Sequence, residues 1–385
     1  MILERARRWG REVVANALYY SGLLGLVQRL LRPKPQRSST PHKPRRDSVS
    51  EPQFAILYYH RVGTGGVPLF SGVRPEVFEA QMRFLRQRCR LVSLDELFRG
   101  LQNPNAGGPA LAITFDDGYR DLYTHAFPIL QKYQVPATIF VVVDSIETGE
   151  VPWYDRVFLA LKVLPANRLR LDLDRLRQFD LSSPAARLQA AEEIVQYLRK
   201  LPDQRRREFC VALERKVRLP DEELRGRMLT WEQIRTMHRA GIAFGSHTLT
   251  HRVISRLKAA ETQREILESK EILERKLGAP VLDFSYPFGQ LADCGTAARE
   301  WLARGGYRLA LTTVPGINKP GADLYSLRRI SVGHLQSVGT FALSVSLLFL
   351  RSKADEVRTD TPFPEPPMGE AQWGAKRHEA GGGHA

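Results

Sequence analysis

The chain has 385 residues, 43% of them hydrophobic and 26% charged, which allows one large globular domain with appendages or two small domains. Its three cysteines lie far apart without a CxxC pair, which excludes a disulfide framework and a thiolate metal site. Of the net charge of +15, more than half lies in residues 1–50, where eleven Lys or Arg face three acids. The remainder is only mildly basic and does not indicate a nucleic-acid groove, and a basic arm can equally bind anionic lipid.

The first element along the chain is an apolar stretch at 13–31 with arginines on both sides. Its uninterrupted apolar part is shorter than the roughly 20 residues that a membrane span needs. Trp9, Tyr19 and Tyr20 with the flanking arginines are typical of a helix that lies in the membrane interface. We therefore expect residues 1–32 to form a basic amphipathic helix in peripheral membrane contact. A helix packed on the catalytic domain or on a partner chain is the main alternative, and an uncleaved span or signal is the third.

The rest of the chain divides by composition. Residues 33–52 are rich in Pro, Ser and charge and predict a flexible linker, while the prolines and glycines of 351–385 predict a disordered tail. Between them, residues 53–350 form the expected domain. Its apolar runs predict strands at 54–60, 111–118, 137–143, 242–247, 281–287 and 307–313, with helices at 76–88, 121–133, 230–241 and 258–277.

This alternation of strands and helices predicts parallel strands with crossover helices. The fold is therefore an α/β barrel or an open parallel sheet, and periodicity alone does not separate the two. Residues 148–228 interrupt the rhythm with a sequence rich in Leu, Arg and Glu. We interpret them as a mainly helical insertion that could cap a site.

Two adjacent acids, Asp116 and Asp117, end the strand expected at 111–118, just before Gly118. Active sites of parallel α/β proteins form at that edge of the sheet. In a turn the two carboxylates can point in different directions, so that one binds a metal while the other accepts a proton. The alternative is a helix cap or turn, where Asp is also common.

A second motif, SHTLTH at 246–251, follows the strand expected at 242–247. On one helical turn, His247 and His251 would project to the same face, so both imidazoles could bind one ion. Two His and one carboxylate are a common ligand set for a catalytic divalent metal. A lone HxxxH is often only a surface helix face, but here both motifs would open onto the same sheet edge.

The third motif, DFSYPFGQ at 283–290, is a turn after another strand. Such a turn can present a backbone N–H to an oxyanion and a flat wall to a sugar ring. Tyr286, Pro287 and Phe288 are therefore candidate substrate- or oxyanion-binding residues, although a plain turn would carry no function.

In this order, ITFDDG, SHTLTH and FSYPFG resemble the first three motifs of the polysaccharide deacetylase family, also called the NodB-homology domain or carbohydrate esterase family four. YYHRV at 58–62 resembles the opening strand of its bacterial exopolysaccharide branch. The resemblance covers about 54–335 and implies a distorted (β/α)7 barrel. It also implies a divalent metal, usually zinc, held by three ligands: Asp117, His247 and His251. Asp116 would then be the general base, and the Phe288 N–H would contribute to the oxyanion hole.

The sequence departs from the family pattern at two positions. Ser285 stands where many members have an arginine that orients the base. The family's general acid is a His in its last motif, and its nearest match here is His334, which fits imperfectly. His60 is a further candidate for the pocket because it ends a buried strand.

The sequence thus predicts metal-dependent N-deacetylation of an N-acetylated sugar in a polysaccharide or glycoconjugate, with release of acetate. With a membrane-binding helix, the substrate could be a lipid-linked glycan or nascent envelope polysaccharide, and the protein would belong to the bacterial cell envelope. Two alternatives remain open: a hydrolase of a small non-sugar amide, and a carbohydrate-binding pseudoenzyme on the same barrel.

Overall fold

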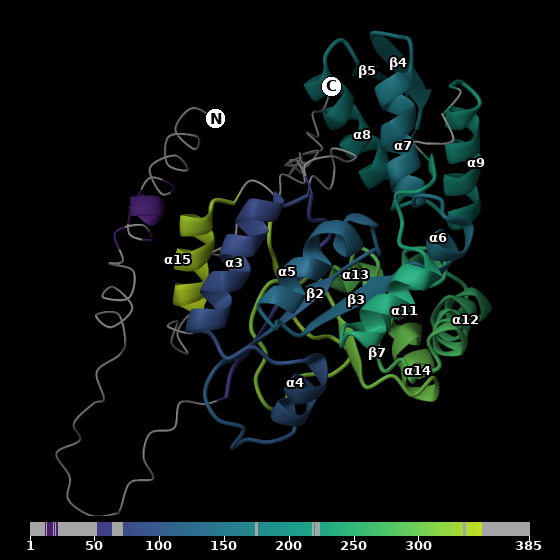
Figure 1. Ribbon diagram of the computed structural model, residues 1–385. Coiled ribbons are helices and arrows are strands. Elements are labelled where there is room, and N and C mark those ends of the chain that lie inside the picture. Colours follow the sequence, from purple (N-terminus) through teal and green to yellow (C-terminus); the bar gives the residue numbers. More distant parts are fainter. Residues whose placement is uncertain are drawn as a thin grey trace, which may run out of the picture.

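The computed structural model in Figure 1 describes most of the expected domain. The linker at 33–51, the candidate acid His334 and the tail at 351–385 lie outside the described residues. The described residues are 12, 14–17, 19, 21, 52–63, 72–173, 176–217, 219, 224–333 and 336–348.

The core of the domain is a seven-stranded sheet in the order β8-β7-β6-β3-β2-β1-β9, in which every neighbouring pair is parallel. β1 and β2 are buried along their whole lengths, as continuous apolar runs predict for strands covered on both faces. The strands are β1 Phe54–Tyr59, β2 Ala110–Phe115, β3 Ala137–Val141, β6 Ala243–Ser246, β7 Asp283–Ser285, β8 Leu309–Leu311 and β9 Ile330–Ser331.

The segment that leads into β9 closes this sheet into a barrel. β9 pairs with β1, and on its other side Leu327 forms a parallel bridge with Leu311 of β8. The Thr312 amide donates to the Leu327 carbonyl at 2.8 Å, and the Arg329 amide donates to Val314 at 3.0 Å. The expected distorted (β/α)7 barrel is therefore confirmed, and periodicity could not have separated it from an open sheet.

Helices surround the sheet in Figure 1. Several begin or end where the sequence has capping residues: Ser93 and Thr230 form capping boxes, and Gly278 ends α12 in the left-handed conformation. The helices of the barrel are α3 Pro75–Arg88, α4 Leu94–Leu101, the π-helix η2 Leu122–Ala126, α5 Phe127–Lys132, α6 Val143–Thr148, α11 Trp231–Arg239, the 3₁₀-helix η3 Ile254–Arg256, α12 Ala259–Leu277, α13 Leu291–Cys294, α14 Thr296–Arg304 and α15 Val338–Leu348.

The insertion at 148–228 forms a separate group of elements at one end of the barrel (Figure 1). It is mainly helical, as expected, but it also contains an antiparallel hairpin. Arg156 of α7 holds Glu214 of α9 with two hydrogen bonds of 2.8 and 2.7 Å. Its elements are α7 Trp153–Val163, β4 Arg168–Asp172, β5 Leu176–Asp180, α8 Pro184–Leu198 and α9 Asp203–Glu214.

Two described residues of the N-terminal segment contact α15 and α3, and the short purple helix in Figure 1 lies beside α15. The Asn16 side-chain oxygen accepts a hydrogen bond of 3.1 Å from the Gly339 amide, and Tyr19 packs edge-on against Phe84. Asn16 and Tyr19 thus contact two helices of the barrel. Within the described ranges, no helix combines the length and the apolar character that crossing a membrane requires.

Candidate active site

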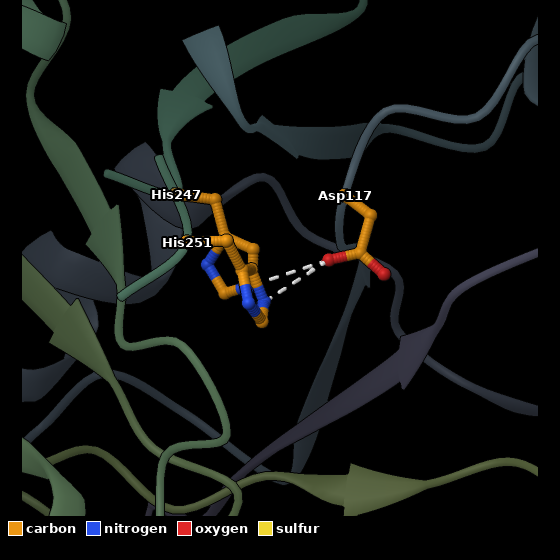
Figure 2. Close-up of side chains that lie close together, drawn as sticks. All are labelled: Asp117, His247 and His251. Carbon is orange, nitrogen blue, oxygen red and sulfur yellow. Dashed lines mark ion pairs between the residues drawn. The ribbon is translucent and has the colours of Figure 1, made fainter. Parts of the chain in front are cut away.

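The three predicted metal ligands lie together at the carboxyl edge of the sheet. Asp117 follows β2, and His247 and His251 follow β6, the next strand but one. The Nε2 atoms of His247 and His251 lie 3.5 and 3.4 Å from the same Asp117 oxygen, and Figure 2 shows both imidazoles facing that carboxylate. Ligand atoms of all three residues lie within 4.8 Å of one another. The three side chains form a candidate metal site.

The two histidines converge for a different reason than the spacing suggested. Residues 247–251 form a loop and not a helical turn, so the helical interpretation of HxxxH is wrong. Thr248 and His251 adopt left-handed backbone conformations with φ of 69° and 55°. The Thr248 hydroxyl accepts a hydrogen bond of 3.0 Å from the His251 amide and thereby fixes this turn.

The protonation states around the ligands suit a divalent cation. His247 Nδ1 lies 2.7 Å from the Ser285 carbonyl, which can only accept, so Nδ1 carries the proton and Nε2 is free to bind. Burial lowers the pKa of both imidazoles, which keeps them neutral. Burial, with repulsion from Asp116 and Asp155, raises the pKa of Asp117 well above its ordinary value, which a bound cation would reverse.

The hydrogen bonding of Asp117 and the distances between the three side chains also fit a divalent cation. Neither oxygen of Asp117 finds a hydrogen-bond partner within the part of the chain that the structure describes, although both are buried. Zinc bonds of about 2.1 Å in tetrahedral geometry place two ligand atoms about 3.4 Å apart, close to the two distances found here. The three side chains therefore fit a zinc-like divalent ion.

Asp116 is held by an arginine that sequence reasoning missed. Arg329, which is fully buried, donates to both Asp116 oxygens at 2.8 and 2.7 Å. It also donates to the Ser285 hydroxyl at 2.9 Å. Burial alone would raise the pKa of Asp116, but Arg329 and His247 lower it to about 2, so the carboxylate is ionised at neutral pH.

An arginine is thus supplied to Asp116 from the segment that leads into β9, although Ser285 stands at the position where it was expected. Arg329 is also fixed by donating to the Thr312 carbonyl at 2.7 Å and by lying over the Tyr58 ring at 4.4 Å. The only sequence signal was a basic pair, Arg328 and Arg329, before a short apolar strand. Nothing local to that pair indicates which of the two arginines is buried.

His60 lies at the edge of the same site. Its ring packs edge-on against Tyr58 at 5.7 Å, and burial lowers its pKa to about 4, against the effect of the nearby Asp116 carboxylate. His60 is therefore neutral at neutral pH.

The third motif forms the expected turn, but its side chains differ in position. The Phe288 ring lies 4.9 Å from the His251 ring, and its φ is 60°. Pro287 is buried, and its carbonyl accepts from the Gly289 amide at 2.7 Å. Tyr286 is buried in the barrel wall, where its hydroxyl donates to the Tyr325 carbonyl at 3.1 Å. Of the three side chains, only Phe288 is shown in ring contact with a metal ligand.

The insertion, which was expected only as a possible cap, directly contacts His251. The Trp153 indole N–H donates to the His251 carbonyl at 3.2 Å, and the Tyr154 ring lies 4.8 Å from the His251 ring. These contacts join residues almost one hundred positions apart.

Comparisons with known proteins agree with this geometry. Residues 103–309 match a family model described as "Polysaccharide deacetylase". The chain is 23% identical over 288 residues to YxkH of Bacillus subtilis (strain 168), whose name assigns it to the polysaccharide deacetylases, and the match covers 74% of each chain. A shorter match, 36% identical over 104 residues, is with the poly-beta-1,6-N-acetyl-D-glucosamine N-deacetylase of Escherichia coli (strain K12). That match covers 25% of this chain and 15% of the relative.

Among solved structures, the barrel is similar to the deacetylase PplD of Streptococcus pyogenes in complex with acetate. The TM-score is 0.51 at 21% identity, with 75% of this chain and 96% of PplD covered. This similarity supports the fold.

Proposed function

Because the chain belongs to the polysaccharide deacetylase family, and is therefore a hydrolase of non-peptide carbon–nitrogen bonds, we propose that it removes acetyl groups from N-acetylated sugars of a polysaccharide in a metal-dependent reaction. The observation that carries the proposal is that two adjacent carboxylates have different surroundings. Asp117 faces two neutral imidazoles, whereas Asp116 is ionised and clamped by Arg329. A binding module would have no need of the second carboxylate beside a metal.

A divalent ion bound by Asp117, His247 and His251 would polarise the acetamide carbonyl and lower the pKa of a water molecule. Zinc is our first choice, because two imidazoles and one carboxylate are common zinc ligands. Asp116 accepts the proton of the attacking water as general base. Arg329 fixes both of its oxygens, so the carboxylate stays oriented and ionised while it acts.

Two further roles complete the proposed reaction. The Phe288 backbone N–H stabilises the oxyanion, and a donor of this kind typically contributes about 10²–10³-fold to the rate. The leaving amine needs a proton, for which His334 is the proposed donor. His60 is less suited to that role, because its pKa of about 4 leaves it without the proton to give at neutral pH.

The proposed substrate is supported by the names of relatives. One of them is named as a deacetylase of poly-beta-1,6-N-acetyl-D-glucosamine, so β-1,6-linked N-acetylglucosamine is our first candidate backbone. A lipid-linked or nascent envelope glycan is the narrower version of this proposal, and it depends on membrane contact through residues 1–32. Co-sedimentation with anionic liposomes, with and without residues 1–35, tests that contact. Equal partition of both forms would exclude it.

Acetate release from a substrate panel tests the proposed function. The panel contains β-1,6- and β-1,4-linked N-acetylglucosamine oligomers and a small non-sugar amide, each with metal-loaded and chelated protein. We expect acetate from at least one sugar, only with metal. Hydrolysis of the small amide alone would favour the non-sugar amidase, whereas oligomer binding without hydrolysis would favour the pseudoenzyme.

A further inference from the structure

The first turn of α7 belongs to the insertion and not to the barrel, yet it contacts a metal ligand through two consecutive residues. Trp153 donates its indole N–H to the His251 carbonyl at 3.2 Å. Tyr154 packs its ring against the His251 imidazole, with 4.8 Å between the centroids. The insertion therefore holds both the backbone and the side chain of His251.

His251 needs such support because its backbone is strained. Its φ of 55° is in the left-handed region, which is unfavourable for a non-glycine residue. Conformations of this kind persist only where surrounding contacts impose them. The His251 amide is fixed by the Thr248 hydroxyl of its own loop, and the carbonyl is fixed by Trp153. One of the two restraints on this ligand's backbone thus comes from outside the barrel.

The α7 turn is itself anchored to the barrel. Asp155, which is buried, accepts a hydrogen bond of 2.9 Å from the hydroxyl of Tyr119, two residues after Asp117. On the insertion side, the Arg206 guanidinium lies over the Trp153 ring at 4.6 Å. The indole of Trp153 therefore contacts α9 directly, and α7, which carries it, is anchored to the barrel by Asp155.

We propose that Trp153 and Tyr154 are positioning residues for the metal ligand His251, so that the insertion at 148–228 completes the metal site in addition to any part in capping it. The inference rests on the proposed function, because it takes His251 to be a metal ligand. Side chains that orient a ligand in this way typically affect metal affinity by about 10–100-fold. Loss of the indole N–H should accordingly weaken metal binding without unfolding the chain.

The test compares Trp153→Phe with Trp301→Phe in the full chain. Both variants lose an indole N–H and keep an aromatic ring, but Trp301 lies on α14, where its ring contacts Arg304. Zinc dissociation constants come from competition with a chromogenic chelator, and the absorption bands of bound Co²⁺ report the ligand geometry. We expect about tenfold weaker zinc binding and altered Co²⁺ bands for Trp153→Phe, and wild-type values for Trp301→Phe.

The metal-free melting temperatures of the two variants separate positioning from stability. A fall in zinc affinity that merely follows a fall in metal-free stability, or zinc affinity within about twofold of wild type, would overturn the inference. Should Trp153→Phe fail to fold, replacement of Trp153 by 3-benzothienylalanine keeps the ring shape and removes only the donor. No zinc binding by the wild-type chain would instead refute the proposed metal centre, which distinguishes that failure from this one.

Discussion

Arg329, in the segment that closes the barrel, binds both carboxylate oxygens of Asp116. The two residues are 213 positions apart in the sequence and meet because β9 lies beside β1, one strand away from β2. Closure of the barrel therefore also brings Arg329 to Asp116, the proposed base. The same arginine lowers the pKa of Asp116 and donates a hydrogen bond to the Thr312 carbonyl next to β8.

Replacement of Asp116 by Asn should remove catalysis and leave the metal site intact. The amide cannot accept the proton, and general-base catalysis typically contributes about 10²–10⁴-fold. We expect acetate release to fall at least about 100-fold while zinc content stays at the wild-type level. Acetate release and bound zinc are measured on the same preparation. Activity above one tenth of wild type would show that Asp116 is not the base.

Replacement of Arg329 by Met should destabilise the fold as well as abolish activity. Removing one partner of a buried ion pair typically costs about 3–5 kcal/mol, because the remaining charge is buried alone. Urea unfolding of the metal-free chain measures this loss. Arg328→Met is the matched control, since the neighbouring arginine is exposed and donates to the Pro315 carbonyl. Equal stabilities of the two variants would contradict the assigned role of Arg329.

Asp155 should give the stability a distinctive pH dependence. Burial raises its pKa to about 6, although the Tyr119 hydrogen bond and Arg61 oppose the shift. The folded chain therefore binds this proton more tightly than the unfolded chain, and the free energy of unfolding falls as the pH rises from about 4 to 6. Above about pH 6 both states are ionised, and this contribution is constant.

The variant Asp155→Asn lacks this titration. We expect its melting temperature, relative to wild type, to rise between about pH 4 and pH 6 and to level off above that range. Thermal unfolding in the presence of a chelator at half-unit pH steps measures the difference. A difference that is independent of pH, or that changes in the opposite direction, would show that the Asp155 carboxyl is not protonated in the folded chain at low pH.

Much of the barrel could be predicted because its strands are continuous apolar runs with polar residues at their ends. Asp116, Asp117 and His247 directly follow strands, so their common edge was accessible from the sequence. The loop that contains His251 was not, because its shape depends on two left-handed residues that spacing does not reveal. The two histidines do lie together at Asp117, but a loop and not a helical turn brings them there.

The partners of these residues could not be predicted for a different reason. Arg329 reaches Asp116, and Trp153 reaches His251, only after the barrel has closed and the insertion has docked. Such contacts join distant segments and leave no local pattern. A basic pair before a short strand, and a tryptophan at the start of an inserted helix, occur equally in proteins where neither contacts an active site.

The most direct test of the central claim is a metal titration of the metal-free chain with β-1,6-linked N-acetylglucosamine oligomers as substrate. Acetate release is followed against bound zinc, with His251→Ala as the variant that lacks one ligand. We predict that activity rises linearly with zinc, saturates near one ion per chain, and is lost with metal affinity in His251→Ala. Full acetate release by the chelated wild-type chain, or wild-type zinc affinity in His251→Ala, would contradict a metal centre built from Asp117, His247 and His251.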